Sequence, residues 1–211
     1  MAVAAAGREA VERALQQRLA ARGMSAALGC AEPLPRPAGG DAAAALELLE
    51  REGPLPGAIS EVAGASGSGV TSLAVRLAAR AARLGQRIAW LDPQDAWDPD
   101  SAARAGVALE QVLWLRGCAA LYGLEGLSRW NEILGLLIQS GGFELLVADF
   151  LAWPLDELGR MPRSAWFRLL RGLERTRRDA LLVLAPQPVA QRCARCTLQL
   201  GAAAGRASLP R

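Results

Sequence analysis

Short apolar runs alternate with helical segments from residue 58 to residue 200, and this alternation constrains the fold more than any other feature. The apolar runs predict strands at 58–63, 87–91, 111–115, 143–149, 180–184 and 197–200. Helices are expected at 71–84, from 101, at 121–139 and at 164–177. The strand runs are apolar throughout, as in strands that are covered on both faces. The pattern predicts an α/β fold with a mostly parallel sheet flanked by helices.

Composition divides the chain into four expected parts. The first, 1–28, holds an amphipathic helix with Val11, Leu15 and Leu19 on one face. A linker rich in proline and glycine, with a short helix, follows at 29–57. The α/β core occupies 58–200. The small and polar residues of 201–211 predict a flexible tail.

A glycine-rich segment, Gly64-Ala-Ser-Gly-Ser-Gly-Val-Thr71, joins the first core strand to the next helix. Its glycine spacing is that of the phosphate-binding loop GxxxxGK[ST]. In such a loop the backbone N–H groups surround a phosphate, the lysine binds it and the hydroxyl holds magnesium. The candidate loop residues are Gly64, Ser66, Gly67, Gly69, Val70 and Thr71.

Val70 stands where this loop has its lysine. A branched apolar side chain gives up charge-assisted hydrogen bonds worth about 1.5–3 kcal/mol each. We therefore expect weak or absent ATP binding, no hydrolysis and no cofactor. Three interpretations stay open: a turn kept for structure, a residual anion or nucleotide site, and a weak ATPase with a replacement cation. Arg76 and Arg80 are the nearby candidates, but their helical spacing carries them away from the phosphates.

Residue types that are missing exclude several kinds of chemistry. All 24 basic residues are arginines, and the chain has no histidine. A Ser-His-Asp triad and the usual zinc sites are excluded, and no metal site is expected. Cys193 and Cys196 form a single CxxC without a second pair, which favours a structural role and leaves redox chemistry or metal binding open. With no signal peptide and no apolar run of the ~20 residues that a membrane span needs, a cytoplasmic protein is expected.

Arginines follow one face of the expected helix at 164–177. Arg168, Arg171, Arg175 and Arg178 lie opposite Trp166, Leu169, Leu170 and Leu173. Two interpretations stay open: a solvated helix face, and a contact with a phosphate backbone or an acidic partner. The net charge of the whole chain, +3, is too small to require a nucleic-acid partner.

The motifs around the glycine-rich loop resemble the RecA recombinase core over about residues 40–200. The resemblance lies in Ile59-Ser-Glu-Val-Ala-Gly64 and in the acidic, proline-bearing segment Ile88-Ala-Trp-Leu-Asp-Pro-Gln-Asp-Ala-Trp-Asp-Pro99. It implies a RecA-like core with an added N-terminal helix. It also implies that Gln94 replaces a water-activating glutamate and that Asp149 matches the Walker B aspartate. Gln187 matches the glutamine that senses the γ-phosphate.

The departures from RecA refine this resemblance. The loops after the strands at 143–149 and 180–184 are short, which makes a RecA-type filament on single-stranded DNA doubtful. A short RecA relative without lysine and with an N-terminal helix looks like the ImuA family of translesion-mutagenesis accessory proteins. That family implies a non-catalytic adaptor in the DNA-damage (SOS) response, whose partners are RecA, an ImuB-like Y-family polymerase homologue and weakly DNA. It implies a cytoplasmic protein, associated with the nucleoid when in complex. The alternatives are a SulA-like cell-division inhibitor, a weak ATPase and a DNA-binding module.

Overall fold

The computed structural model describes residues 42–117, 123–201 and 207–208. The helices of the N-terminal half of this region cover one face of a central sheet, and those of the C-terminal half cover the other. The helices are α2 (Ala42–Glu52), α3 (Val70–Arg83), α4 (Pro99–Arg104), α5 (Gly123–Ser140), α6 (Leu155–Leu158) and α7 (Arg163–Thr176), with the short 3-10 turns η1 (Leu109–Gln111) and η3 (Gln191–Cys193). The strands are β1 (Ile59–Gly64), β2 (Ile88–Asp92), β3 (Val112–Arg116), β4 (Leu145–Asp149), β5 (Ala180–Ala185), β6 (Ala194–Leu200) and β7 (Ala207–Ser208).

The sheet has the strand order β3-β2-β4-β5-β1-β6-β7. Strands β1 to β6 pair in parallel, and the short β7 pairs antiparallel with β6. Parallel neighbours need crossover connections, and helices α3, α4, α5 and α7 lie in these connections. The expected α/β fold with a mostly parallel sheet and flanking helices is confirmed.

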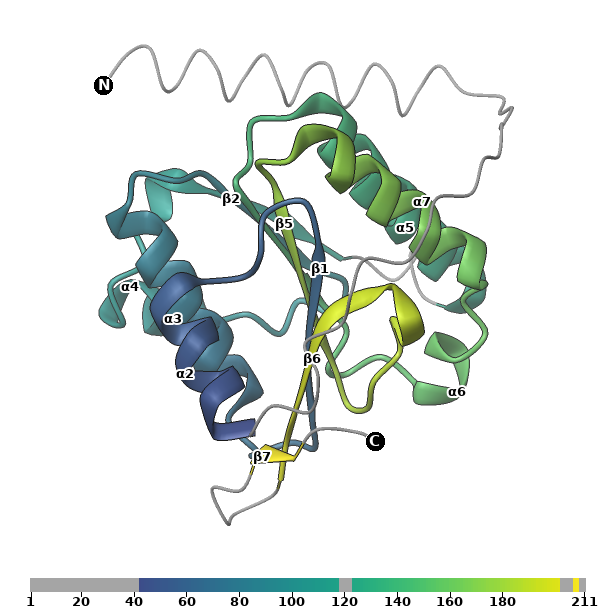
Figure 1. The fold of residues 1–211 in the computed structure, drawn as a ribbon, viewed down its shortest axis with the longest axis horizontal. Helices are drawn as coiled ribbons and strands as arrows, with labels where there is room; N and C mark the ends of the chain where they lie inside the picture. The colour runs from purple at the N-terminus through teal and green to yellow at the C-terminus, as the bar shows by residue number, and fades with distance from the viewer. Residues whose placement is uncertain (1–41, 118–122, 202–206, 209–211) are drawn as a thin grey trace. The chain divides into compact units, whose positions relative to one another are not determined.

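The two faces of the sheet are covered by different helices (Figure 1). Helices α2, α3 and α4 cover one face, and α5 and α7 cover the other. On the first face Leu73 and Leu77 of α3 pack with strand residues such as Val62, Trp90 and Val147. On the second face α5 and α7 approach so closely that a Cβ on Gly172 would lie 2.8 Å from Cγ2 of Ile138. Strands β1, β2, β4 and β5 are covered on both faces and are largely apolar, whereas β6 and the end of β3 are partly exposed.

Several details differ from the expectations. Helix α3 begins at Val70, α4 already begins at Pro99, and the one-turn helix α6 has no counterpart in the sequence pattern. Strand β6 starts three residues earlier than expected, so Cys196 lies within it and Cys193 lies just before it. Ala207 and Ser208 form β7 within the segment expected to be a flexible tail. Burial raises the pKa of both thiols, and both are free, in keeping with the structural role favoured for the CxxC.

Candidate functional site: a glycine loop at the carboxyl edge of the sheet

The glycine-rich loop keeps the backbone conformation that its sequence requires. Strand β1 ends at Gly64 and α3 begins at Val70. Gly67 and Gly69 have φ values of +80° and +91°, in the left-handed region that favours glycine. Helix α3 has no side-chain cap and no acidic residue in its first turn. Its first N–H groups and the positive end of its dipole therefore face the loop, as an anion requires.

Val70 turns away from that site and into the core. Its side chain is 3% exposed and belongs to the cluster between α3 and the sheet. Its Cγ2 atom lies 3.0 Å from the place that a Cβ on Gly64 would take. The residue at the lysine position thus supplies neither a charge nor a donor to the loop. Val70 instead supplies apolar packing beneath the loop.

Ser68 adds a contact inside the loop that sequence reasoning missed. Its N–H donates to the carbonyl oxygen of Ala65 at 3.0 Å, so this amide already has a partner. Its Oγ atom is buried without a hydrogen-bond partner, and a Cβ on Gly64 would overlap it. The same Cβ would lie 2.9 Å from the backbone carbonyl oxygen of Leu200, which cannot yield, so this position requires glycine. Ser66 and Thr71 are exposed at the two ends of the loop.

Asp149 lies at the end of β4, at the same carboxyl edge of the sheet. The pKa of Asp149 is raised to about 6. Desolvation by burial is the largest cause and the nearby charge of Asp92 adds to it, while the N–H of Leu151, a donor at 3.2 Å, acts against it. Asp92 is adjacent because Leu91 and Ala148, the preceding residues, pair across β2 and β4. A carboxyl group with this pKa is mostly ionised near neutral pH, so it can still serve as a metal ligand.

The turn after β2 carries Gln94 and is held by Asp92. The buried Asp92 carboxylate accepts from the N–H groups of Ala96 and Trp97, both at 2.9 Å, and from Trp114 Nε1 at 3.2 Å. The ring of Trp97 stacks on Trp90 at 5.0 Å and meets Trp114 edge-on at 5.2 Å. Gln94 itself is half-buried. Its neighbours are therefore fixed by a buried carboxylate and three indoles.

A second clamp holds the same turn from outside. Asp95 has a φ of +55°, which is unusual for a residue other than glycine. Arg116, from the end of β3, donates to both carboxylate oxygens of Asp95 at 2.7 and 2.6 Å. The same guanidinium lies 4.5 Å from the ring centroid of Trp114. The ion pair and the cation–π contact together hold Asp95 in its strained conformation.

Gln187 follows β5 and is exposed between two prolines. The next residues bind Glu61, a buried carboxylate of β1 that the sequence did not single out. Glu61 Oε1 accepts from the N–H of Val189 at 2.5 Å and of Ala190 at 2.9 Å, and Oε2 contacts the hydroxyl of Thr197 at 3.5 Å. Desolvation by burial raises the pKa of Glu61, and these donors lower it. A charged residue within an apolar strand was the signal that could have identified it.

The fold thus brings the expected loop residues to one edge. The glycine loop, Gln94, Asp149 and Gln187 all follow the carboxyl ends of parallel strands, where ligands bind in such sheets. The loop keeps the left-handed glycines and the following helix N-terminus of a phosphate-binding loop, whereas the side chain at the lysine position is apolar. Within the described residues, no group of three potential ligands among His, Cys, Asp and Glu could hold a metal.

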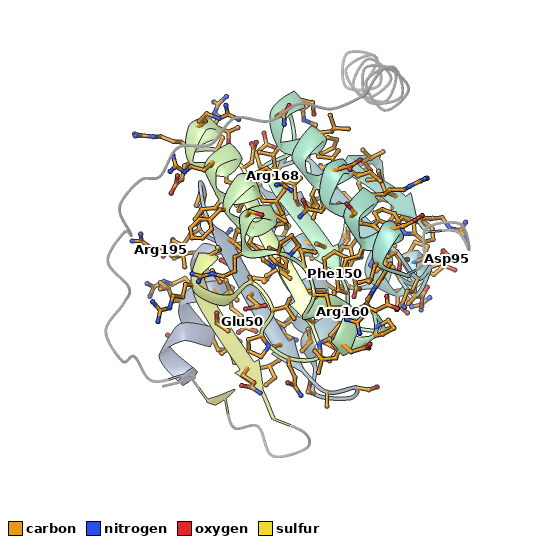
Figure 2. All side chains as sticks on the ribbon, turned by 90° about the vertical axis from the view of Figure 1, so that its right-hand side faces the viewer. Glu50, Asp95, Phe150, Arg160, Arg168 and Arg195 are labelled. Atoms are coloured by element: carbon orange, nitrogen blue, oxygen red, sulfur yellow. The ribbon has the colours of Figure 1, made fainter. Side chains whose placement is uncertain are left out.

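The arginine face of α7 forms as the sequence predicts. Trp166, Leu169 and Leu173 are buried, and Leu170 is half-buried. Arg168 and Arg175 are exposed on the outer side of the helix, Arg171 is half-buried, and Arg178 is exposed just beyond its end. Figure 2 looks onto the side of the molecule that carries α5 and α7 and labels Arg168 and Arg195.

This part of the chain concentrates positive charge. Residues 160–195 contain nine arginines against Glu174 and Asp179, a net charge of +7, whereas the rest of the chain carries −4. In the part of the chain that the structure describes, the ion pairs involve Arg51, Arg76, Arg104 and Arg116, so none of these nine arginines is in one. The expected N-terminal face, Val11, Leu15 and Leu19, lies outside the described residues.

No helix in the described residues has the length and apolar composition needed to cross a bilayer.

Comparisons with known proteins agree with this geometry. Residues 39–160 match the profile of the RecA N-terminal domain. Protein RecA of Laribacter hongkongensis is 33% identical over 108 residues, which are 51% of this chain and 28% of that protein. Protein RecA of Streptococcus parasanguinis is 35% identical over 109 residues, 51% of this chain and 27% of that protein. The match therefore spans little more than a quarter of these relatives.

The fold is also similar to that of a solved recombinase. The crystal structure of the RadB recombinase superimposes with a TM-score of 0.53 at 19% identity, over 79% of this chain and 82% of that one. The profile match begins before α2 and ends before α7, so it contains the glycine loop, the Gln94 turn and Asp149. By sequence match and by fold, the chain belongs to the family of the RecA N-terminal domain.

Proposed function

We propose that this protein is a non-catalytic RecA-like adaptor in damage-induced translesion DNA synthesis, acting in the cytoplasm and on the nucleoid. The observation that carries the proposal is the burial of Val70. At 3% exposure, the residue at the lysine position belongs to the hydrophobic core. A lysine there would bind the β- and γ-phosphates of a nucleotide.

Gln94 further supports the loss of catalysis. At the position of the water-activating glutamate, it carries a neutral amide that cannot accept a proton as a carboxylate does. The glycine loop then serves as a strand-to-helix turn with at most a residual anion site.

The proposed partners are RecA and an ImuB-like Y-family polymerase homologue, on the basis of the resemblance to the ImuA family. The N-terminal face of Val11, Leu15 and Leu19 is the proposed contact with a partner. Removal of residues 1–30 is then expected to abolish RecA binding while the core stays folded.

The test is an affinity capture of the full chain from DNA-damaged cells of its own source, with each captured protein then purified and its affinity measured. Direct binding of RecA and of a Y-family polymerase homologue supports the adaptor. Binding of the tubulin-like division protein instead identifies a SulA-like inhibitor. ATP turnover by the purified chain that Asp149→Asn abolishes identifies a weak ATPase.

The α7 side supports a second candidate, a nucleic-acid contact. Helix α7 carries Arg163, Arg168, Arg171 and Arg175, none of them in an ion pair with a described residue, and the exposed ring of Phe167 below the Arg163 guanidinium; these groups could contact phosphates and a base. Labelled single-stranded DNA is expected to bind with an affinity that falls with salt, and reversal of Arg168, Arg171 and Arg175 is expected to abolish this binding. Absence of a shift at low salt would reject this candidate.

A further inference from the structure

A groove of about 370 Å³ lies on the outer side of α3, between this helix, α2 and the end of α4. Its apolar lining comes from Leu77 and Ala79 of α3 and from Ala105 after α4. Four charged side chains complete the lining, namely Glu50, Arg76, Arg80 and Arg83. The groove is separate from the glycine loop, because Arg80 lies ten residues, or about 15 Å of helix, beyond Val70.

Two of the three arginines are held in place. Arg76 donates through Nε and Nη2 to Oε1 of Glu50, at 3.0 and 2.7 Å. Arg80 donates through Nε to the carbonyl oxygen of Arg51 at 2.9 Å, near the C-terminus of α2. Its Nη1 lies 3.0 Å from the place that a Cβ on Gly53 would take. Each guanidinium keeps further N–H groups that point to no acceptor among the described residues.

Arg83 has no such attachment. It is exposed, and it makes no hydrogen bond or ion pair with the described residues. Three guanidinium groups and one carboxylate therefore line the groove, and among the described residues only Arg76 bonds that carboxylate. Arginines that are already ordered lose little side-chain entropy when they bind a carboxylate through two parallel bonds.

We propose that this groove binds an acidic helical segment of a protein partner through carboxylates that face the arginines. Arg76, Arg80 and Arg83 are spaced i, i+4 and i+7, about 10 Å along the helix. Carboxylates with the same spacing on a partner helix lie on one face. The inference rests on the adaptor function proposed above, because it gives one of the protein partners a place to dock.

The charges around the groove favour a polypeptide over a nucleic acid. Helix α2 contributes Glu50 to the groove wall and carries Glu47 about one turn before it on the same side of the helix. A continuous phosphate backbone would meet these carboxylates, whereas a helix with a few well-placed carboxylates avoids them. The α7 side offers a polyanion a much larger excess of arginines.

The direct test is a titration of the full chain with a short synthetic helical peptide that carries glutamates at i, i+4 and i+7. The readout is the NMR shift of each arginine Nε–H. We expect saturable shifts at Arg76, Arg80 and Arg83. Affinity should fall about tenfold for a glutamine version of the peptide and for Arg83→Glu. Arg129→Glu, another exposed arginine without a bond among the described residues, is the matched control and should bind as the unaltered chain does.

The contrary outcomes are distinct. Shifts that appear equally on the α7 arginines, or equally with oligo-dT, would show unspecific charge attraction and overturn the inference. If RecA or the polymerase homologue binds the Arg83→Glu chain as tightly as the unaltered one, the groove is not the docking site and the adaptor function stands. Peptide binding in the groove without binding of either protein would keep the groove and reject those partners.

Discussion

The glycine loop and the turn after β2 lie at the same edge of the sheet and have different internal support. The loop depends on backbone conformation, with left-handed Gly67 and Gly69, and it has no ion pair. The turn depends on side chains, with Asp92 inside it and the Asp95–Arg116 pair outside it. The glycine loop is therefore explained by the need to join β1 to α3, whereas the Gln94 turn is held by side-chain hydrogen bonds and an ion pair.

Gly117→Ala should break the turn and have the largest effect. The N–H of Gly117 donates to the carbonyl oxygen of Asp92 at 2.8 Å, and an added Cβ would overlap the carbonyl oxygen of Pro93. Backbone atoms cannot yield as a side chain can, so we expect the free energy of unfolding to fall by about 4 kcal/mol. Urea denaturation measures it. Gly135→Ala, whose Cβ would meet nothing within 4 Å, is the control and should be neutral or stabilising.

Asp149→Asn tests the carboxylate between the two regions. Its folded pKa, about 6, lies above the ordinary value of 3.8, so deprotonation costs more in the folded chain. The protein therefore loses stability as the pH rises from about 4 to about 6, by up to about 3 kcal/mol. The Asp149→Asn chain has no carboxyl group at this position and should not lose this stability. The free energies of unfolding of the two chains should therefore differ at pH 7.5 and converge near pH 4.

Urea denaturation at both pH values gives the comparison. Asp156→Asn, which alters an exposed carboxyl group of α6, should change little at either pH. An equal effect of both substitutions at pH 7.5 would contradict the role of burial at Asp149.

Val70→Lys sharpens the comparison on the side of the loop. The substitution removes a buried side chain, at a cost of about 2 kcal/mol, and returns a cation to the loop. We expect the Val70→Lys chain to bind a fluorescent ATP analogue measurably but not to hydrolyse ATP. Hydrolysis should require Gln94→Glu in addition.

Val70→Ala is the matched control, since it loses the same packing and gains no charge. If Val70→Ala binds the ATP analogue as well as Val70→Lys does, the cation is not what the loop lacks.

Gly67→Ala should have the smallest effect. A Cβ there would meet nothing within 4 Å, so only the φ of +80° opposes it. The left-handed conformation costs an alanine about 1 kcal/mol, and Gly67→Asn should cost less because asparagine tolerates it better. Thermal unfolding of the two variants measures the difference. A loss as large as that of Gly117→Ala would mean that the loop, too, is held by contacts.

The central strands and the long helices followed from the sequence pattern, because β1, β2, β4 and β5 are covered on both faces and leave clear apolar runs. The exceptions are instructive. Helix α6 is a single turn, too short for a helical period to be seen. Strand β7 exists through its pairing with β6, which a local pattern does not contain.

The candidate site divides in the same way. The glycine spacing, Gln94, Asp149 and Gln187 could be read from the chain, because each stands next to the end of a strand. The hydrogen-bond partners of Glu61 could not, since Val189 and Ala190 are 128 and 129 residues away along the chain. The groove beside α3 could not either, because its lining combines α2, α3 and α4.

The sequence by itself determined the α/β class, the glycine loop and the missing lysine, because these depend on local pattern and residue type. Only the tertiary structure decided that Val70 belongs to the core, that Asp92 and Asp149 share one edge, and that three arginines surround a groove. These properties depend on which distant segments meet, and burial and electrostatic interaction act through space, whatever the separation along the chain.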